Sequence, residues 1–371
     1  MLQAQFNQII FRGYHFGLYS VIEQEDETRM SKRIVFCADG TWDSPAEHTN
    51  VYKLYKALLV TATQIPFYDD GVGADGNPIS KVLGGAFGTG LWQKIKDGYA
   101  KIAHVYEAGD QLFLFGFSRG AYTARSLAGM ISACGLPTTN FTDDIVDIAF
   151  KAYRDKADRQ NILSGLTNFA MDGPNITMAG VWDTVGSLGI PAAIGLSDPI
   201  AYGFLDTSLS PKIQNAYHAL AIDEKRAQFP PTLWTSQPAP GQTMEQVWFV
   251  GVHSDVGGGE PDDTPGTTAL SDITLGWMMS KASGLGLQFD PNVLAQYQVP
   301  LMPEYSLDTL HASWNILWGL PRERSIANNA TLANSVKFRC MKDSSYRPEH
   351  LTFENDVLSA LYGITQVVQE L

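Results

Sequence analysis

A serine between two glycines, directly after a short apolar run, is the feature that most constrains how this chain can fold. The run and the serine lie in residues 112–121, LFLFGFSRGA, with Ser118 between Gly116 and Gly120. A few consecutive apolar residues are the length of a fully buried strand, whereas buried helices are usually much longer. Apolar residues then recur at helical spacing up to Gly135, a residue type that commonly ends helices. The pattern predicts that Ser118 lies at a turn from a strand into a helix.

The string G-x-S-x-G by itself is weak support for a function. With 34 glycines in 371 residues, roughly 0.2 accidental matches are expected per chain at ordinary serine usage. At a strand-to-helix turn, however, such glycines let the strand and the helix approach closely, and the serine is held in a strained conformation with its hydroxyl exposed. We therefore predict a nucleophile elbow. The alternative is a glycine-rich turn in which the serine only caps the helix.

The balance of charges argues against two classes of partner. The net charge is −13, and Lys and Arg form no cluster in the sequence. Nucleic acid and steady attachment to anionic lipid both require such a cluster. We therefore expect no nucleic-acid partner, while transient contact with a membrane surface and the oligomeric state stay open.

The sequence contains no segment that is expected to direct the chain into or across a membrane. The first thirty residues hold only short apolar pieces, unlike a signal peptide, and no long charge-free apolar helix is evident elsewhere. The cysteines, Cys37, Cys134 and Cys340, are odd in number and lack metal-ligand spacing, which predicts buried thiols in a reducing compartment. The expected location is cytoplasmic, with non-classical secretion as an open alternative.

The chain length and the alternation of predicted strands and helices predict one large domain that follows an N-terminal extension. Residues 1–30 offer no core strand, and Met30 resembles a second start before the first apolar run, so it stays open whether 1–30 belong to the native protein. Residues 31–371 are expected to form a single α/β domain with a mostly parallel central sheet flanked by helices, because buried strands alternate with amphipathic helices. A glycine- and proline-rich stretch at about 184–235 lacks this alternation and is predicted to be a cap or lid insertion.

Two further predicted strands end at residue types that acyl transfer requires. The apolar runs at 176–182 and 247–252 are followed by Asp183 and His253, and catalytic groups of parallel α/β sheets gather at this carboxyl edge. The order Ser, Asp, His along the chain is characteristic of the α/β-hydrolase fold. In such a triad, His253 removes the proton of Ser118 as a general base, and Asp183 fixes the imidazole tautomer.

Each of these assignments has an alternative. Asp183 could cap a turn. Asp255 is a rival acid, although we expect it to order the glycine loop that follows it. His253 is preferred because, of the seven histidines, it alone follows a strong apolar run. A metal site built from His253, Asp255 and Asp39 is a further alternative, although no metal is expected.

The oxyanion of a tetrahedral intermediate requires two backbone N–H donors in fixed positions. One is expected from Arg119, directly after the nucleophile, and the other from the loop after the first strand, where Gly40 and Thr41 lie. Asp39 precedes this loop. We predict that Asp39 holds the loop in place and takes no part in the chemistry, because a carboxylate that faces a developing oxyanion would raise the barrier.

Several short blocks of the sequence resemble the signature of a known family. They are residues 39–42 (DGTW), 68–73 (YDDGVG), 116–121 (GFSRGA), 181–186 (VWDTVG) and 253–259 (HSDVGGG), with weaker similarity at 218–224 (HALAIDE) and 346–348 (YRP). The family is a widespread, largely uncharacterised group of α/β-hydrolase domains that includes the first class of type VI secretion phospholipase effectors. The resemblance spans about residues 32–350 and implies the triad Ser118, Asp183 and His253.

These observations together predict a serine hydrolase that cleaves carboxylic esters through an acyl-enzyme, with neither metal nor organic cofactor. Lipid-like esters are the favoured substrates, as for a lipase or phospholipase. Two apolar, glycine-rich segments, 82–91 and 186–205, are expected to line the entrance and bury an acyl chain, or else to cover the core. The alternatives are a thioesterase or small-ester esterase, and a hydrolase-fold binding protein without activity.

Overall fold

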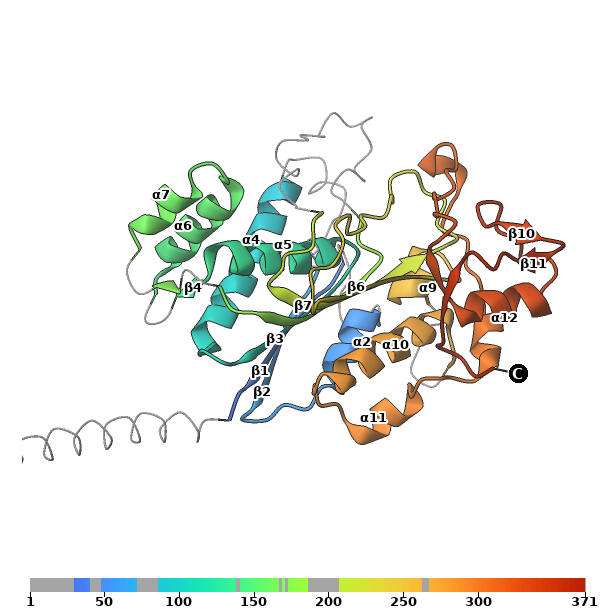
Figure 1. Cartoon of the computed structure of the whole chain (residues 1–371), viewed down its shortest axis with the longest axis horizontal. Coiled ribbons are helices and arrows are strands. Elements are labelled where there is room, and N and C mark those ends of the chain that lie inside the picture. Colours follow the sequence, from blue (N-terminus) through green and yellow to red (C-terminus); the bar gives the residue numbers. More distant parts are fainter. Residues whose placement is uncertain are drawn as a thin grey trace, which may run out of the picture.

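The protein is built around a parallel β-sheet, which Figure 1 shows in a computed structural model. The structure describes residues 30–40, 48–71, 86–137, 141–166, 169–170, 173–185, 207–261 and 267–370. Eight strands lie in the order β12-β9-β8-β7-β6-β3-β1-β2, and every neighbouring pair is parallel. Their bounds are β1 (Arg33–Ala38), β2 (Gln64–Asp69), β3 (Gln111–Phe117), β6 (Ile176–Trp182), β7 (Ile213–Ala221), β8 (Thr243–Phe249), β9 (Thr331–Ala333) and β12 (Gly363–Thr365).

Helices cover both faces of this sheet (Figure 1). One apolar core contains side chains of α4 (Ala86–Val105), α5 (Ser118–Cys134), α6 (Asp143–Arg154) and α7 (Arg159–Ser164). The other contains side chains of α2 (Asn50–Ala57), α10 (Leu270–Gly284) and α12 (Asn334–Lys342). In β1, alternate residues enter the two cores: Ile34 and Phe36 face the first, and Val35 and Cys37 the second. Burial on both faces explains why β1, β3 and β6 are almost entirely apolar runs.

The remaining elements are short. They are the helices α9 (His253–Gly257) and α11 (Pro291–Gln296), the 3₁₀ turns η4 (Pro303–Leu307) and η5 (Ile316–Trp318), and two antiparallel pairs, β4 (Leu136–Pro137) with β5 (Phe169–Ala170) and β10 (Phe353–Glu354) with β11 (Val357–Leu358). Of these, α9 matters most for function, because it begins at His253.

The predicted mostly parallel sheet flanked by helices is confirmed. The strands expected around 34–38, 112–117, 176–182 and 247–252 are β1, β3, β6 and β8, although β8 ends earlier, at Phe249. Cys37, Cys134 and Cys340 are buried and free, as predicted. Among the described residues, no helix combines the length and the apolar character that crossing a bilayer requires.

The expected cap or lid at about 184–235 is wrong as a single insertion. It contains β7, a central strand that pairs with both β6 and β8. Polar residues interrupt this strand, and one of them, His218, is completely buried. Because of these polar residues, the sequence analysis did not predict a core strand here. Residues 186–206, the remaining candidate for a lid, lie outside the described residues, as do 1–29.

The segment 82–91 is not wholly a loop at an entrance. Helix α4 begins at Ala86, and Leu91 is buried in the first core with 2% of its surface exposed. Leu91 is thus committed to packing between helix and sheet and is not available to line an acyl groove. Residues 82–85 lie outside the described residues.

Candidate active site

Ser118 occupies a strained turn between β3 and α5. Its φ angle is +56°, in the left-handed region that non-glycine residues seldom adopt. A Cβ atom on Gly116 would lie 2.4 Å from the carbonyl oxygen of Gly120, and one on Gly120 would lie 2.2 Å from that of Ala38. Strand, helix and β1 therefore approach as closely as the elbow prediction requires. The Ser118 side chain, however, is buried, where the sequence predicted an exposed hydroxyl.

Parallel pairing brings Ser118 and Asp183 to the same edge of the sheet. Phe117 of β3 is in register with Trp182 of β6, so the two following residues leave the sheet side by side. Asp183 also has a positive φ, +38°. Its backbone N–H donates to Ala219 of the next strand. Two neighbouring strands thus end in strained residues that carry the predicted nucleophile and acid.

Asp183 and His253 form a buried hydrogen-bonded pair. The distance from His253 Nδ1 to Asp183 Oδ2 is 2.5 Å, which assigns the proton to Nδ1 and leaves Nε2 to accept one. The imidazole contacts two aromatic rings, with its centroid 4.6 Å from that of Phe117 and 5.1 Å from that of Phe229. Because Phe117 directly precedes Ser118, His253 lies beside the elbow.

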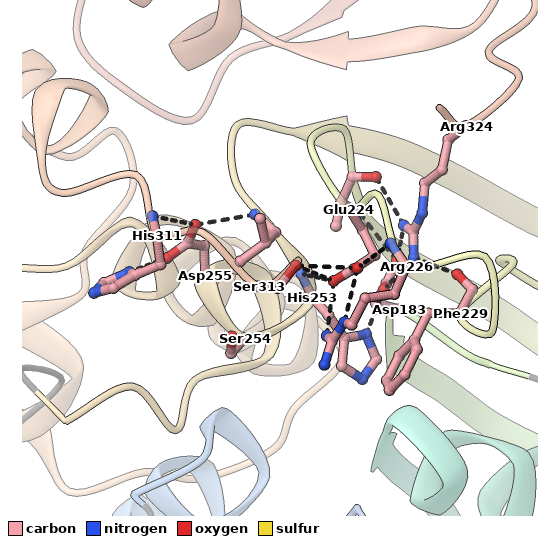
Figure 2. Close-up of polar contacts among 12 residues, drawn as sticks. Asp183, Glu224, Arg226, Phe229, His253, Ser254, Asp255, His311, Ser313 and Arg324 are labelled. Carbon is pink, nitrogen blue, oxygen red and sulfur yellow. Dashed lines mark hydrogen bonds and ion pairs between the residues drawn. The ribbon is translucent and has the colours of Figure 1, made fainter. Parts of the chain in front are cut away.

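Arg324 is a member of this site that the sequence analysis did not identify. Its Nη1 donates to Asp183 Oδ1 at 2.6 Å and its Nη2 to Asp183 Oδ2 at 2.8 Å. The backbone N–H of Ala221 also donates to Oδ1 at 3.0 Å. Both carboxylate oxygens are therefore fully engaged, as Figure 2 shows in part. Nothing in the sequence marked Arg324, because it lies 141 residues after Asp183 and follows no strand.

The surroundings favour a charged Asp183 and a neutral His253. Burial raises the pKa of Asp183, but the charge of Arg324 and the hydrogen bonds from His253 and Arg324 outweigh it and hold the pKa well below its usual range. Burial lowers the pKa of His253, and Arg226 lowers it further, against the opposing effects of Asp183 and Glu224. The imidazole is thus the proton-accepting form near neutral pH.

Glu224 and Arg226 form a second charged pair next to His253. Glu224 follows β7 and is 1% exposed. It accepts hydrogen bonds from Arg226 Nε and Nη2, both at 2.8 Å, and from the backbone N–H of His253 at 3.3 Å. Ser313 Oγ donates to it at 3.0 Å. Burial raises the pKa of Glu224, but the hydrogen bonds and charge of Arg226 lower it more, so the carboxyl group is ionised.

Asp255 is occupied elsewhere and does not contact His253. Its Oδ1 lies 2.5 Å from His311 Nδ1, and its Oδ2 accepts the backbone N–H of Val252 at 3.0 Å, at the start of α9. These contacts tie Asp255 to the start of α9 and to His311, and the expectation that it orders the glycine loop after it stays a prediction. Nor do the described residues bring His253, Asp255 and Asp39 together as a metal-binding cluster.

A single segment, residues 308–324, supplies three of the donors at this edge. His311 contacts Asp255, Ser313 contacts Glu224 and Arg324 contacts Asp183 (Figure 2). The three acceptors follow β8, β7 and β6 respectively. The segment therefore crosses the ends of three neighbouring strands.

Asp39, directly after β1, accepts hydrogen bonds at both carboxylate oxygens, and its role in holding the loop that follows stays a prediction. Its Oδ2 accepts hydrogen bonds from Thr49 Oγ1 at 2.6 Å and Tyr68 Oη at 2.8 Å, and its Oδ1 accepts the N–H of Gly40 at 2.9 Å. The Gly40 N–H, a predicted oxyanion donor, is thus bonded to a carboxylate in this structure. Arg119 lies in the first turn of α5, and Thr41 lies outside the described residues.

Comparison with known proteins finds a curated relative, and the match covers only part of each protein. The chain is 28% identical over 245 residues to the yeast "Uncharacterized protein YEL023C" (Saccharomyces cerevisiae), a match that covers 58% of this chain and 35% of the yeast protein. It thus spans about a third of the curated relative that it matches.

Two solved structures are also similar. A crystal structure of an uncharacterised protein from Pseudomonas aeruginosa has a TM-score of 0.45 at 17% identity, covering 76% of this chain and 50% of that one. The Tle1 effector bound to the VgrG spike of the type 6 secretion system has a TM-score of 0.37 at 18% identity, covering 64% and 52%.

A family model shows the family of this chain. The model of the catalytic domain of type VI secretion phospholipase effectors of the Tle1-like group matches residues 32–281, which is more than half of the 371 residues. This region contains β1 to β8, the elbow, Asp183 and His253. The chain therefore belongs to the family of Tle1-like phospholipase effector catalytic domains, a family of lipase- and phospholipase-type hydrolases.

Proposed function

We propose that this protein is a serine hydrolase that cleaves carboxylic esters of lipid-like substrates, with Ser118, His253 and Asp183 as its catalytic triad. One observation carries the proposal: the buried Asp183–His253 pair lies against Phe117, the residue directly before the strained Ser118. Family membership supports the substrate class. The fully engaged Asp183 carboxylate supports the assignment of this residue as the acid.

The reaction follows from these positions. His253 Nε2 accepts the proton of Ser118 Oγ while the oxygen attacks the ester carbonyl, and the N–H of Arg119 donates to the oxyanion. The tetrahedral intermediate collapses as His253 returns the proton to the leaving alcohol, which gives an acyl-serine. Water, deprotonated by the same histidine, then attacks the acyl carbonyl and releases the carboxylic acid.

Asp183 keeps His253 in the productive tautomer. Its carboxylate accepts a hydrogen bond from Nδ1–H, which leaves Nε2 as the proton acceptor for the serine, and its negative charge stabilises the imidazolium that forms transiently. Arg324 and the N–H of Ala221 fix the plane of this carboxylate. Neither Asp183 nor Arg324 needs to change its protonation state during the reaction.

A labelling gel with a fluorophosphonate probe tests the mechanism. Wild-type protein should be labelled and Ser118→Ala should not, whereas a catalytically inactive binding protein would be unlabelled in both forms. Esters of p-nitrophenol test the substrate class. If a groove takes the acyl chain, kcat/KM should rise up to roughly fourfold per added methylene, from acetate to octanoate, since each buried CH₂ contributes about 0.8 kcal/mol. A preference for acetate would favour a small-ester esterase, and faster turnover of matched thioesters a thioesterase.

A further inference from the structure

Arg226 presents a guanidinium group that is rigidly held next to His253. Glu224 accepts hydrogen bonds from its Nε and Nη2, each at 2.8 Å. One aromatic ring, Phe229, lies 3.8 Å from the guanidinium carbon, and a second, Trp318, lies 5.2 Å from it. A two-point hydrogen bond fixes the plane of the group and the rings restrict its tilt. The side chain is therefore organised before any ligand arrives.

One edge of this guanidinium remains available. Nη1 donates to no residue among those that the structure describes, and the Arg226 side chain is 14% exposed. The ring of Phe229 contacts both the guanidinium, at 3.8 Å, and the imidazole of His253, at 5.1 Å. Figure 2 shows Arg226 and His253 side by side. A donor with unused hydrogen-bonding capacity thus adjoins the general base.

Glu224 orients Arg226 and also accepts hydrogen bonds from other donors. The same carboxylate also accepts from Ser313 Oγ and from the backbone N–H of His253. Glu224 therefore holds Nε and Nη2 of Arg226 in place and leaves Nη1 for another acceptor. Arginine is well suited to this role because its remaining N–H groups bind the oxygens of phosphate or carboxylate.

We propose that Arg226 binds an anionic oxygen group of the ester substrate, a phosphate or a carboxylate, close to the bond that is cleaved. This inference rests on the proposed ester hydrolysis and specifies one part of the substrate. Arg226 is a specificity-determining residue: it fixes the anionic group of the substrate, while His253 and Ser118 act on the ester. Esters that lack an anionic group gain nothing from it.

Three soluble substrates with the same acyl chains test the proposal. They are dihexanoylglycerol, its phosphocholine derivative and its hemisuccinate, used below their aggregation limits, so that only the third position of the glycerol differs. For each preparation, kcat/KM is measured as the release of hexanoate, because the hemisuccinate carries a third ester bond, and the value for each anionic ester is divided by the value for the neutral ester. This ratio does not depend on the fraction of active enzyme, so a variant that folds poorly still gives a result.

Arg226→Gln should lower this ratio by on the order of 10- to 100-fold for the anion that Arg226 binds, as expected for a lost hydrogen bond to a charged group. Arg226→Lys should lose less, because the charge stays but the planar fork is lost. Arg322→Gln is the matched control: it removes an exposed arginine whose backbone N–H donates to Lys225, one residue before Arg226. The control should leave the ratio unchanged.

The outcomes separate the two proposals. A fall for the phosphocholine ester alone identifies phosphate, and a fall for the hemisuccinate alone identifies carboxylate. An unchanged ratio would show that Arg226 contacts no anion: equal losses on all three esters would mean that it only supports the structure or the reacting centre, and no loss on any of them that it has no role in turnover. Either result would overturn the inference while leaving ester hydrolysis intact. Wild-type protein without any Ser118-dependent hydrolysis would refute the proposed function itself.

Discussion

Arg324 and His253 share the carboxylate of Asp183. The guanidinium binds both oxygens, at 2.6 and 2.8 Å, and the imidazole binds one of them at 2.5 Å. A positive charge at this position reduces the gain that the imidazolium obtains from the same carboxylate. The arrangement therefore favours a proton-accepting histidine and a permanently ionised aspartate.

Replacing Arg324 should shift the pH dependence of activity. The charged groups that face His253 are Asp183, Glu224, Arg226 and, through Asp183, Arg324. In Arg324→Gln, the Asp183 charge acts on the imidazole without offset, so the pKa of His253 rises. Since the base must be neutral, the acidic limb of the kcat/KM profile should move to higher pH. Loss of one partner of a buried ion pair should also cost about 3–5 kcal/mol of unfolding free energy.

The control for this shift is Arg339→Gln. Arg339 is also buried, but its Nη1 donates to the backbone oxygens of Ser306 and Asp308. This variant should lose stability and keep the position of the acidic limb. If Arg324→Gln is destabilised with an unmoved limb, Arg324 is structural only.

Ser118→Ala should abolish turnover and preserve the fold. We expect kcat to fall on the order of 10³- to 10⁶-fold, because the nucleophile is lost while binding contacts remain. Near-unchanged circular dichroism and melting temperature would accompany this loss. Ser126→Ala, which removes a buried hydroxyl from the same helix, should retain activity. Comparable turnover by Ser118→Ala and wild type would mean that Ser118 is not the nucleophile.

The two candidate acids can be compared directly. Asp183→Asn should lower kcat about 10⁴-fold, because an amide that donates to Nδ1 stabilises the unproductive tautomer. Asp255→Asn should affect activity far less, since its partners are His311 and the N–H of Val252. Steady-state kinetics on purified variants of matched stability would check this. The reverse order of effects would assign Asp255 as the acid.

Asp223 should make stability depend on pH. Burial raises its pKa to about 6, above the value near 3.9 of an unfolded aspartate. The folded state therefore gains most from Asp223 below pH 4, and this contribution is lost as pH rises through 6. Asp223→Asn keeps an acceptor for Gly251 N–H and Tyr346 Oη and removes the titration. Relative to wild type, it should gain up to about 3 kcal/mol between pH 4 and pH 8.

Urea unfolding at several pH values measures this difference. Asp343 is the matched control, because hydrogen bonds from Ser345 lower its pKa. Asp343→Asn should therefore change relative stability in the opposite direction as pH rises. A pH-independent difference for Asp223→Asn would show that Asp223 does not titrate in the folded protein between these values.

The sequence was informative where function follows directly after an apolar strand. Asp183 and His253, which the structure joins, were predicted because each follows such a run, and Ser118 because its glycines mark a close approach. The strand β7 was missed because His218 is a polar residue completely buried in it. No local sequence pattern predicts that a histidine will be buried by packing against distant parts of the chain.

The rest of the site depends on contacts between distant parts of the chain. Arg324 lies in a segment without periodicity, and its partner is 141 residues away. The hydrogen bond from the Gly40 N–H to Asp39 depends on a side-chain rotamer, which spacing alone cannot predict. Local sequence patterns predicted where the strands end. The charged groups that surround these strand ends were found only in the folded structure.

The segment 308–324 has a practical consequence for dividing this protein into fragments. A fragment that stops at residue 281, where the family match ends, would keep Asp183, Glu224 and Asp255 but lose Arg324, Ser313 and His311, their partners. Asp183 would then be left in the sheet without its cation, and β9 and β12 would be missing from one edge. The boundary recognised by similarity therefore separates the three carboxylates of this site from the side chains that bind them.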